Sequence, residues 1–326
     1  MTSTFIDSER KRQCKLLKDG FFGIAKGFGC WWDYKSKSWK NYPHILTHDD
    51  SLANLYAPIR QKALDYFKYN DIAWWRQDED RYFPSGHLLS SQNHCLNHLF
   101  ALRADKDAVL AIIQAQIPEI CEILPSPIDE KFCCTDKYPY KTPSYMSFEF
   151  TYENITLLSE KCNKRGANCT SVDVFVYAKD NNGKHVLIPI EWKYTETYKK
   201  TENEKIPQSV IEKRYLDKTD TAISHLKGWQ ESYYWDPHYE LARQSLLMEQ
   251  IIKNQSFEAD YYQHIVVCPA GNTEMREDAF TFKEPLSETG QKHFHVIAPE
   301  ELLKPIQGNK KYAKLIDYLQ NRYWHE

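Results

Sequence analysis

A mixed α/β protein, in which helices flank a β-sheet, is the fold that the 326-residue sequence predicts. Alternation of apolar and polar residues marks strands at 147–153, 171–178 and 185–194. Apolar residues at helical spacing mark helices before and after these strands. Hydrophobic residues make up 42% of the chain and charged residues 27%, which is the composition of a globular protein with a sizeable core.

The chain up to residue 125 differs in character from the rest. We expect residues 1–20 to begin as a mobile arm, because they mix charged side chains with few apolar ones. Residues 21–90 are rich in aromatic side chains and show no clear periodicity. Prolines punctuate 124–145, which indicates a long loop or linker. We therefore predict an accessory or recognition region over 1–125, an aromatic-rich helical extension, and a second domain over 126–326.

Local signals predict the remaining elements. Ser90 or Ser91 is expected near the N-cap of a helix over 88–103, and Asp105 is expected to cap a second helix over 105–117. The later elements, in order, are a polar loop at 195–220, helices at roughly 219–234 and 238–253, a buried strand at 261–272, a strand at 293–298 and a helix near 310–323.

The strands at 171–178 and 185–194 are predicted to form a hairpin. The sequence Asp-Asn-Asn-Gly between them, at 180–183, is a strong turn signal. We expect Pro189 to mark an edge strand or a bulge, because proline cannot donate a hydrogen bond to a neighbouring strand.

Asp173, Glu191 and Lys193 carry the predicted chemistry. Asp173 lies in the first strand of the hairpin, and Glu191 and Lys193 share one face of the second. Antiparallel pairing can bring the two carboxylates together, which is unfavourable unless a cation joins them. Mg²⁺ takes oxygen ligands of this kind, and it can polarise a phosphodiester and activate a water. A lysine beside the ion can orient that water or neutralise charge that develops on the phosphate.

The order Ser-Val-Asp-Val, hairpin, Ile-Glu-Trp-Lys resembles the PD-(D/E)xK nuclease superfamily, whose core is a mixed sheet flanked by helices. The resemblance covers roughly residues 147–270. It departs from the superfamily pattern at Val172, which stands where that pattern has proline. The segments 165–173 and 191–196 also resemble an uncharacterised bacterial branch of the superfamily. The resemblance implies a restriction-endonuclease-like nuclease core over 126–326.

Carried over to this sequence, the resemblance implies roles for individual residues. Asp173 and Glu191 would bind the metal, and Lys193 would be the catalytic lysine. The carbonyl of Trp192 would complete the coordination. The implied activity is Mg²⁺-dependent hydrolysis of DNA phosphodiesters, with Mn²⁺ able to substitute.

Two further residues enter through the resemblance alone. Superfamily members often carry another glutamate upstream, for which Glu149 is the first candidate and Glu153 the second. Some members carry a glutamine on the helix after the motif, and Gln244 occupies a comparable place. Solvent-facing positions are the alternative for both Glu149 and Gln244.

Basic and aromatic residues are candidates for contacts with nucleic acid. Tryptophans and tyrosines before position 85 could stack on bases, although core packing is the commoner use. Acidic residues are interleaved with the basic residues that follow the second strand, so contact with a phosphate backbone and a solvated loop are equally good explanations. These basic residues are Lys199, Lys200, Lys205, Lys213 and Arg214.

His94 and His98 offer an alternative metal site. They lie four residues apart on an expected helix, with Cys95 between them, and zinc would need a third ligand. We expect instead two partly exposed histidines that bind no metal.

Composition narrows the class of protein. The formal net charge of −3 disfavours a protein that coats DNA non-specifically, but an enzyme with one basic cleft needs no basic total. The sequence lacks a phosphate-binding loop of the G-x-x-x-x-G-K-[ST] type, so we expect no nucleotide cofactor. The 9 cysteines do not form a disulfide pattern, and neither a signal peptide nor a membrane span is expected. We therefore expect a cytoplasmic setting.

Two functions stay open at this point. The first is a metal-dependent endonuclease that acts on DNA, with restriction or defence as its expected role. A homodimer would supply two active sites for the two strands. The alternative is a nucleic-acid-binding or adaptor module that keeps the restriction-endonuclease-like fold with little or no catalysis. A different α/β protein with a chance motif is a third explanation. The sequence does not distinguish DNA from RNA.

Overall fold

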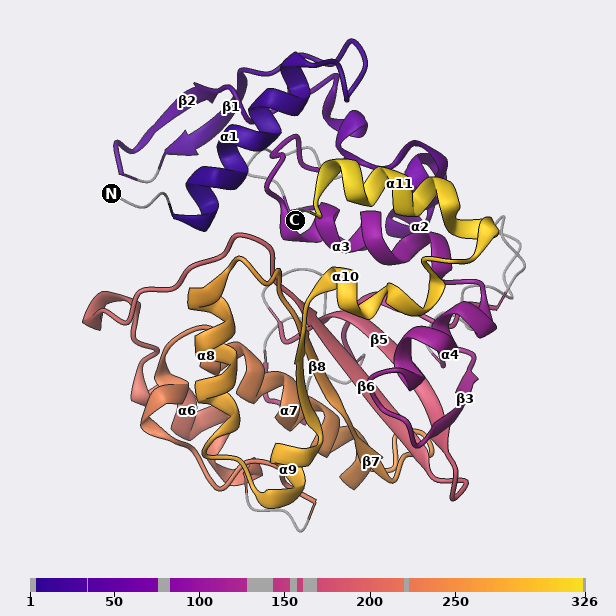
Figure 1. The fold of residues 1–326 in the computed structure, drawn as a ribbon. Helices are drawn as coiled ribbons and strands as arrows, with labels where there is room; N and C mark the ends of the chain where they lie inside the picture. Colours follow the sequence, from indigo (N-terminus) through magenta and orange to yellow (C-terminus); the bar gives the residue numbers. More distant parts are fainter. Residues whose placement is uncertain are drawn as a thin grey trace. The chain divides into compact units, whose positions relative to one another are not determined.

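The computed structural model describes residues 4–33, 35–75, 83–127, 143–152, 157–160, 169–219 and 223–324, and the chain divides into two compact units (Figure 1). Unit 1 comprises Met1–Ala101 and Ile306–Glu326, and unit 2 comprises Leu102–Pro305. In the part of the chain that the structure describes, no helix is long and apolar enough to cross a membrane.

The two units divide the chain differently from the regions 1–125 and 126–326 that the sequence suggested. Residues 102–125 belong to unit 2, because α4 (Lys106–Gln114) contacts β3 (Ile120–Leu124) and β3 pairs with β5 of the sheet. At the other end, α11 (Ala313–Arg322) contacts α3 (Ser91–Leu99) in unit 1. The functional roles assigned to the two regions stay predictions.

Unit 2 is built on a mixed sheet flanked by helices, which confirms the predicted fold class. Its described strands follow the order β3-β5-β6-β8-β9, with β4 beside β5 and β7 beside β6. Strands β5 and β6 are antiparallel, and β8 and β9 extend the sheet parallel to β6. The bounds are β4 Ser147–Phe150, β5 Val172–Asp180, β6 His185–Trp192, β7 Tyr261–Tyr262, β8 His264–Val267 and β9 Phe294–Ile297.

The predicted hairpin is present in β5 and β6. Asp180 N donates to Lys184 O (3.0 Å), and the carboxylate of Asp180 accepts from the backbone N–H of Asn182 (2.8 Å) and of Lys184 (2.9 Å). Gly183 closes the turn with a φ of +77°, a conformation that glycine adopts without strain.

The expectation that Pro189 marks an edge or a bulge is wrong. Pro189 lies opposite Phe175 in β6, and β6 is a central strand between β5 and β8. On the other side of β6, the pairs with β7 end at Leu187 and those with β8 begin at Ile190. The proline therefore stands where β6 changes partner, so its missing N–H breaks no regular pairing.

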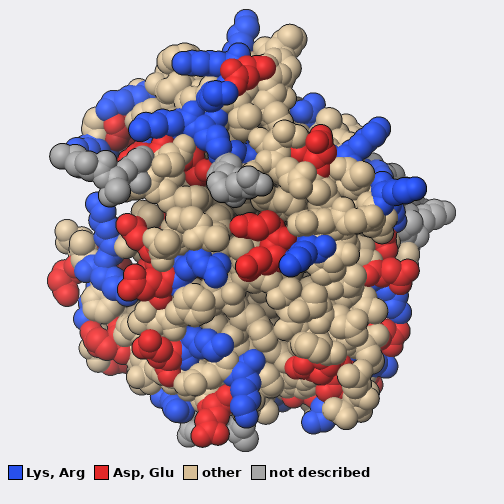
Figure 2. Space-filling model, viewed as in Figure 1, with Lys and Arg blue, Asp and Glu red and all other residues tan. Residues whose placement is uncertain are grey.

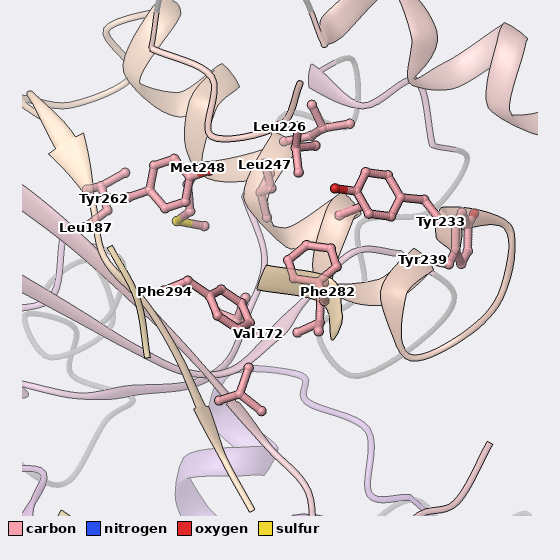
Figure 3. Packing of buried hydrophobic residues seen from close by; sticks show 14 of the residues in the cluster. Val172, Leu187, Leu226, Tyr233, Tyr239, Leu247, Met248, Tyr262, Phe282 and Phe294 are labelled. Atoms are coloured by element: carbon pink, nitrogen blue, oxygen red, sulfur yellow. The ribbon is translucent and has the colours of Figure 1, made fainter. Parts of the chain in front are cut away.

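The helix expected at 238–253 is present as α7 (His238–Lys253) and packs against the sheet. Val172 and Leu187 from the sheet belong to one buried core with Leu247 and Met248 from α7, which Figure 3 shows. Full burial of such side chains contributes roughly 1.5–3 kcal/mol each. Further helices of unit 2 are α6 Gln208–Arg214, α8 Thr273–Lys283, α9 Glu288–Lys292 and α10 Pro299–Leu302.

Two expectations about the stretch before α7 are wrong. The region 195–220 is not only loop, because α6 lies within it. The helix expected at 219–234 is reduced, within the described residues, to the short 3-10 helix η7 (Glu231–Tyr234).

Unit 1 begins with a helix where the sequence suggested a mobile arm. Helix α1 (Phe5–Lys18) is capped by Thr4, whose hydroxyl accepts from Asp7 N (3.3 Å), and it buries Glu9 and Gln13. Buried polar residues gave no apolar stripe, so periodicity did not reveal this helix. The other elements are the antiparallel pair β1 (Gly29–Asp33) and β2 (Ser38–Tyr42), and helix α2 (Arg60–Tyr69).

The predicted caps of the next two helices are confirmed. Ser90 accepts from Asn93 N at the start of α3 (3.3 Å), and Asp105 accepts from Ala108 N at the start of α4 (3.1 Å). Both helices are shorter than expected.

His94 and His98 are buried rather than partly exposed. His98 Nδ1 lies 2.7 Å from the carbonyl oxygen of His94, and His98 Nε2 accepts from the indole N–H of Trp324 (3.1 Å). Burial lowers the pKa of His98 to about 3. Both ring nitrogens of His98 thus have hydrogen-bond partners within unit 1, so His98 stabilises the packing of that unit.

The two units carry opposite formal charges. Unit 1 contains 18 Lys and Arg against 13 Asp and Glu, a net charge of +5, and unit 2 contains 24 against 32, a net charge of −8. Side chains of both signs are nevertheless interspersed on the face drawn in Figure 2. The net charges of the two units therefore do not make the drawn face uniformly basic or acidic.

Candidate functional site

The hairpin brings Asp173 and Glu191 together. Asp173 Oδ2 accepts from Trp192 N (2.7 Å), so the Asp173 carboxylate reaches the backbone of β6 beside Glu191. Asp173 is half-buried and Glu191 is buried. Burial and the charge of Glu149 hold the pKa of Asp173 well above its ordinary value, while burial and the charge of Asp173 do the same to the pKa of Glu191. The charge of Asp173 therefore disfavours the ionised form of Glu191.

Lys193 follows the end of β6, where its N–H donates to Val267 O of β8 (2.8 Å). Its side chain is 7% exposed, and Nζ lies 2.5 Å from both Glu191 Oε1 and Glu240 Oε2. Burial alone would lower the pKa of Lys193, but the charges of Glu191 and Glu240 outweigh it and hold the pKa well above its ordinary value. The site therefore keeps a charged ammonium in a buried position.

Gln244 joins the site from α7. Its Nε2 donates to Glu191 Oε2 (2.5 Å) and to Ser171 O (2.9 Å), and the residue is fully buried. Its Oε1 has no hydrogen-bond partner among the described residues. The amide therefore holds Glu191 in place and leaves one buried acceptor to bind something else.

Glu149 meets Asp173 from the neighbouring strand. In β4, Phe148 pairs with Val174 and Phe150 pairs with Val172, which puts Glu149 at the level of Asp173. Glu149 is 3% exposed and adopts a φ of +49°, a left-handed conformation that is uncommon for residues other than glycine. Such strain is held by its surroundings and often occurs at functional sites. The second-choice residue, Glu153, lies outside the described residues.

Glu240 also lies in this site, although it was not among the residues predicted from the sequence. It lies one helical turn before Gln244 on α7, so the two side chains share a helix face. Burial would raise the pKa of Glu240, but the charge of Lys193 outweighs it and lowers this pKa below the ordinary value. The spacing Glu-x-x-x-Gln on the predicted helix was the signal that could have revealed it.

A second ion pair supports the strand that carries Asp173. Glu160 accepts from the N–H of Thr170 (2.8 Å) and from its hydroxyl (2.6 Å). Arg243, next to Gln244 on α7, lies 3.4 Å from Glu160 and donates to the Thr170 hydroxyl (3.1 Å). These contacts tie α7 to the chain that enters β5.

The donor set suits a hard divalent cation. Within the described ranges, no group of three or more His, Cys, Asp or Glu residues is already arranged to hold a metal ion. Asp173 and Glu191 nevertheless supply two carboxylates, and the charge of Asp173 disfavours the charge of Glu191, a repulsion that a cation would remove. Oxygen donors of this kind fit Mg²⁺ and Mn²⁺.

The basic residues after β6 have mixed surroundings. Lys199 and Lys213 are exposed, and Arg214 is half-buried. Lys200 lies 3.2 Å from Asp278, and Lys205 lies 2.9 Å from Glu231. Contact of these five residues with nucleic acid stays a prediction; Lys199, Lys200 and Lys213 are exposed.

The sequence model of the family described as "Restriction Endonuclease associating with ARP" matches residues 18–324, and the chain belongs to this restriction-endonuclease-like family. The match spans both units and includes every candidate site residue named above. Comparisons with curated proteins and with solved structures returned no significant match. Family and sheet together confirm the predicted restriction-endonuclease-like fold, and the family indicates a nuclease or defence-related role.

Proposed function

We propose that this protein is a PD-(D/E)xK-type endonuclease that hydrolyses phosphodiester bonds of DNA with a divalent metal ion. The observation that carries the proposal is a network around Glu191. Glu191 contacts Lys193 and Gln244, and Asp173 accepts a hydrogen bond from the N–H of Trp192, the residue after Glu191 in β6. Membership of a restriction-endonuclease family supports a nuclease, and the buried acids and lysine supply groups suited to hydrolysis.

Asp173 and Glu191 are the proposed metal ligands, with the Trp192 carbonyl and Glu149 as further oxygen donors. Mg²⁺ is the proposed ion, with Mn²⁺ able to substitute. When bound, such an ion polarises the phosphodiester and lowers the pKa of a water ligand.

Lys193 has a role of its own in this proposal. Its ammonium stays charged between Glu191 and Glu240, so it can orient the attacking water or offset negative charge that develops on the phosphate. Glu240 acts through Lys193 as a positioning residue, and Gln244 fixes the orientation of Glu191.

Basic residues supply the substrate contacts in this proposal. Lys199, Lys200, Lys205, Lys213 and Arg214 are proposed to contact the phosphate backbone. The net charge of +5 on unit 1 would add a general attraction for a polyanion. A homodimer would supply two centres for cutting both strands of a duplex, and no nucleotide cofactor is required.

Cleavage of supercoiled plasmid, single-stranded DNA and RNA by the full chain tests the proposal. Reactions contain Mg²⁺, Mn²⁺ or EDTA, and wild type is compared with Glu191→Ala and Lys193→Ala. Lys179→Ala, a half-buried position at the other end of the hairpin, is the matched control. We expect metal-dependent DNA cleavage by wild type and the control, and none by the two site variants.

Other outcomes discriminate between the functions. Folded wild-type protein that binds DNA but cuts no substrate in either metal would favour the adaptor alternative. Cleavage of RNA alone would correct the substrate class. Cleavage that survives in folded Glu191→Ala would place the chemistry elsewhere.

A further inference from the structure

Unit 1 contains a cavity that the proposed active site does not use. Its volume is about 270 Å³, just below the roughly 300–1,000 Å³ of small-molecule sites. The lining comes from residues 28–31, Trp39 and Asn41 around the β1–β2 hairpin, from residues 45–48 and Ser51, and from Ser85 and Gly86. None of the described residues that line it is Lys, Arg, Asp or Glu. The cavity therefore suits a small neutral group better than a phosphate or an ammonium.

Backbone contacts hold the cavity open. Gly29 N donates to Ile45 O (2.8 Å), and Leu46 N donates to Gly86 O (2.8 Å). A Cβ atom would lie 2.1 Å from Leu46 O if built on Gly29, and 2.6 Å from it if built on Gly86. Both glycines thus permit a close approach that no other residue allows. The walls form a fixed frame, as ligand sites usually do.

Two buried serines supply polar groups to the lining. Ser51 and Ser85 are each 1% exposed. Ser85 Oγ accepts from His87 N (3.1 Å), and its carbonyl accepts from Asn54 and Asn93 (2.8 Å each). The Ser51 hydroxyl has no hydrogen-bond partner in the part of the chain that the structure describes. The Ser51 hydroxyl is therefore available to pair with a polar group that enters the cavity.

Aromatic side chains line the same cavity and reach solvent. Phe28 is 66% exposed and Trp39 is 50% exposed, while Trp31 is half-buried. Phe28 adopts a φ of +63°, which is rare for a bulky residue and marks a backbone held in place by its surroundings. Exposed rings beside a neutral cavity are suited to stacking on another flat ring.

We propose that this cavity binds one nucleobase that has left its stack. Trp39 or Phe28 lies against the ring, and the Ser51 hydroxyl bonds to its polar edge. The inference rests on the proposed function, in which the substrate is nucleic acid. A neutral lining accepts the base, while the net positive charge of unit 1 attracts the sugar–phosphate strand outside it. The same base chemistry is available from a strand or from a free nucleoside.

The test measures binding of a labelled single-stranded DNA to the full chain in EDTA, by fluorescence anisotropy. Trp39→Ala and Ser51→Ala are compared with Trp75→Ala, a tryptophan of the same unit that is 61% exposed and does not line the cavity. We expect Trp39→Ala to weaken binding about tenfold, within the range for loss of one stacked base, and Ser51→Ala to weaken it by up to about tenfold, as loss of one hydrogen bond would. Trp75→Ala should bind as wild type does.

Three further measurements test whether the cavity binds a base. A strand of abasic nucleotides should bind wild type and Trp39→Ala equally weakly. Free nucleosides should compete with the strand only at high concentration; if they bind as tightly as the strand, the cavity still holds a base but the source is free nucleoside. Ser51→Ala should keep the wild-type thermal midpoint, because the hydroxyl has no partner to lose.

Several results would overturn the proposal. These are equal binding by Trp39→Ala, Ser51→Ala and wild type, equal affinity for abasic and intact strands, or stronger competition by a tryptophan-containing peptide than by nucleosides. Binding in EDTA is independent of cleavage. If wild type cleaves DNA and the cavity variants bind it as wild type does, only the proposal of a base-binding cavity is refuted. If binding depends on the cavity but wild type cleaves nothing, only the proposal of a nuclease is refuted.

Discussion

Replacing Glu249 with glutamine should stabilise unit 2 at pH 8.5 (a value chosen about 1.5 units above the carboxyl's pKa) and leave its stability nearly unchanged near pH 4. Glu249 is fully buried on α7. Its Oε1 accepts from His225 N and from the Tyr262 hydroxyl (2.9 Å each), whereas Oε2 has no partner among the described residues. Burial raises the pKa of this carboxyl from 4.5 to about 7. The folded state therefore favours the neutral form.

The magnitude follows from that rise in pKa. Because the folded-state pKa lies above the unfolded value, the stability that the neutral carboxyl provides is complete below about pH 4.5 and is lost as the pH rises through about 7. At roughly 1.4 kcal/mol per pKa unit, the loss amounts to about 3 kcal/mol above pH 7. Glutamine keeps the acceptor oxygen and does not ionise, so its advantage over glutamate should grow over this pH range.

Urea unfolding at pH 4, 6 and 8.5, followed by tryptophan fluorescence, measures the effect. The difference in unfolding free energy between wild type and Glu249→Gln isolates this group, because all other titrations are common to both. Glu258→Gln, on a side chain that is 81% exposed, is the control and should show no such trend. A difference that is independent of pH, or that favours wild type at high pH, would refute the reasoning.

Three other changes test the surroundings of the site. Glu240→Gln removes one of the two charges that hold Lys193, so the cleavage rate should fall about ten- to a hundredfold, with Mg²⁺ affinity little changed in a titration. Glu160→Ala leaves the half-buried Arg243 without its ion pair and the Thr170 N–H without its acceptor, and it should lower the unfolding free energy in urea by about 1–3 kcal/mol. Asp173→Asn removes a carboxylate whose pKa is raised by burial and by the charge of Glu149, so the thermal midpoint in EDTA at pH 8 should rise, while cleavage in Mg²⁺ should be lost; a lower midpoint would contradict this.

The parts of the fold with strong local signals were predictable. Alternating residues and the Asp-Asn-Asn-Gly turn identified the β5–β6 hairpin, and an apolar stripe identified α7. Asp173, Glu191 and Lys193 followed from the same alternation, because strand period decides which side chains share a face. The prediction of these three residues as neighbours needed only local structure.

Elements that depend on tertiary partners were not predictable. Helix α1 buries Glu9 and Gln13, and a buried polar residue gives no amphipathic pattern. Pro189 in a central strand is tolerated only because β6 changes neighbour there, which a single strand cannot show. Glu240 reaches Lys193 only when α7 lies over the sheet, so its role needs the packed structure.

The binding of Mn²⁺ to the full chain tests the proposed centre most directly. Electron paramagnetic resonance counts free Mn²⁺ as wild type, Asp173→Asn, Glu191→Gln and the control Glu258→Gln are titrated. If the two buried carboxylates hold the ion, wild type and the control bind it alike, and both site variants lose affinity by about tenfold or more. Equal Mn²⁺ binding by all four proteins would contradict a metal centre at Asp173 and Glu191.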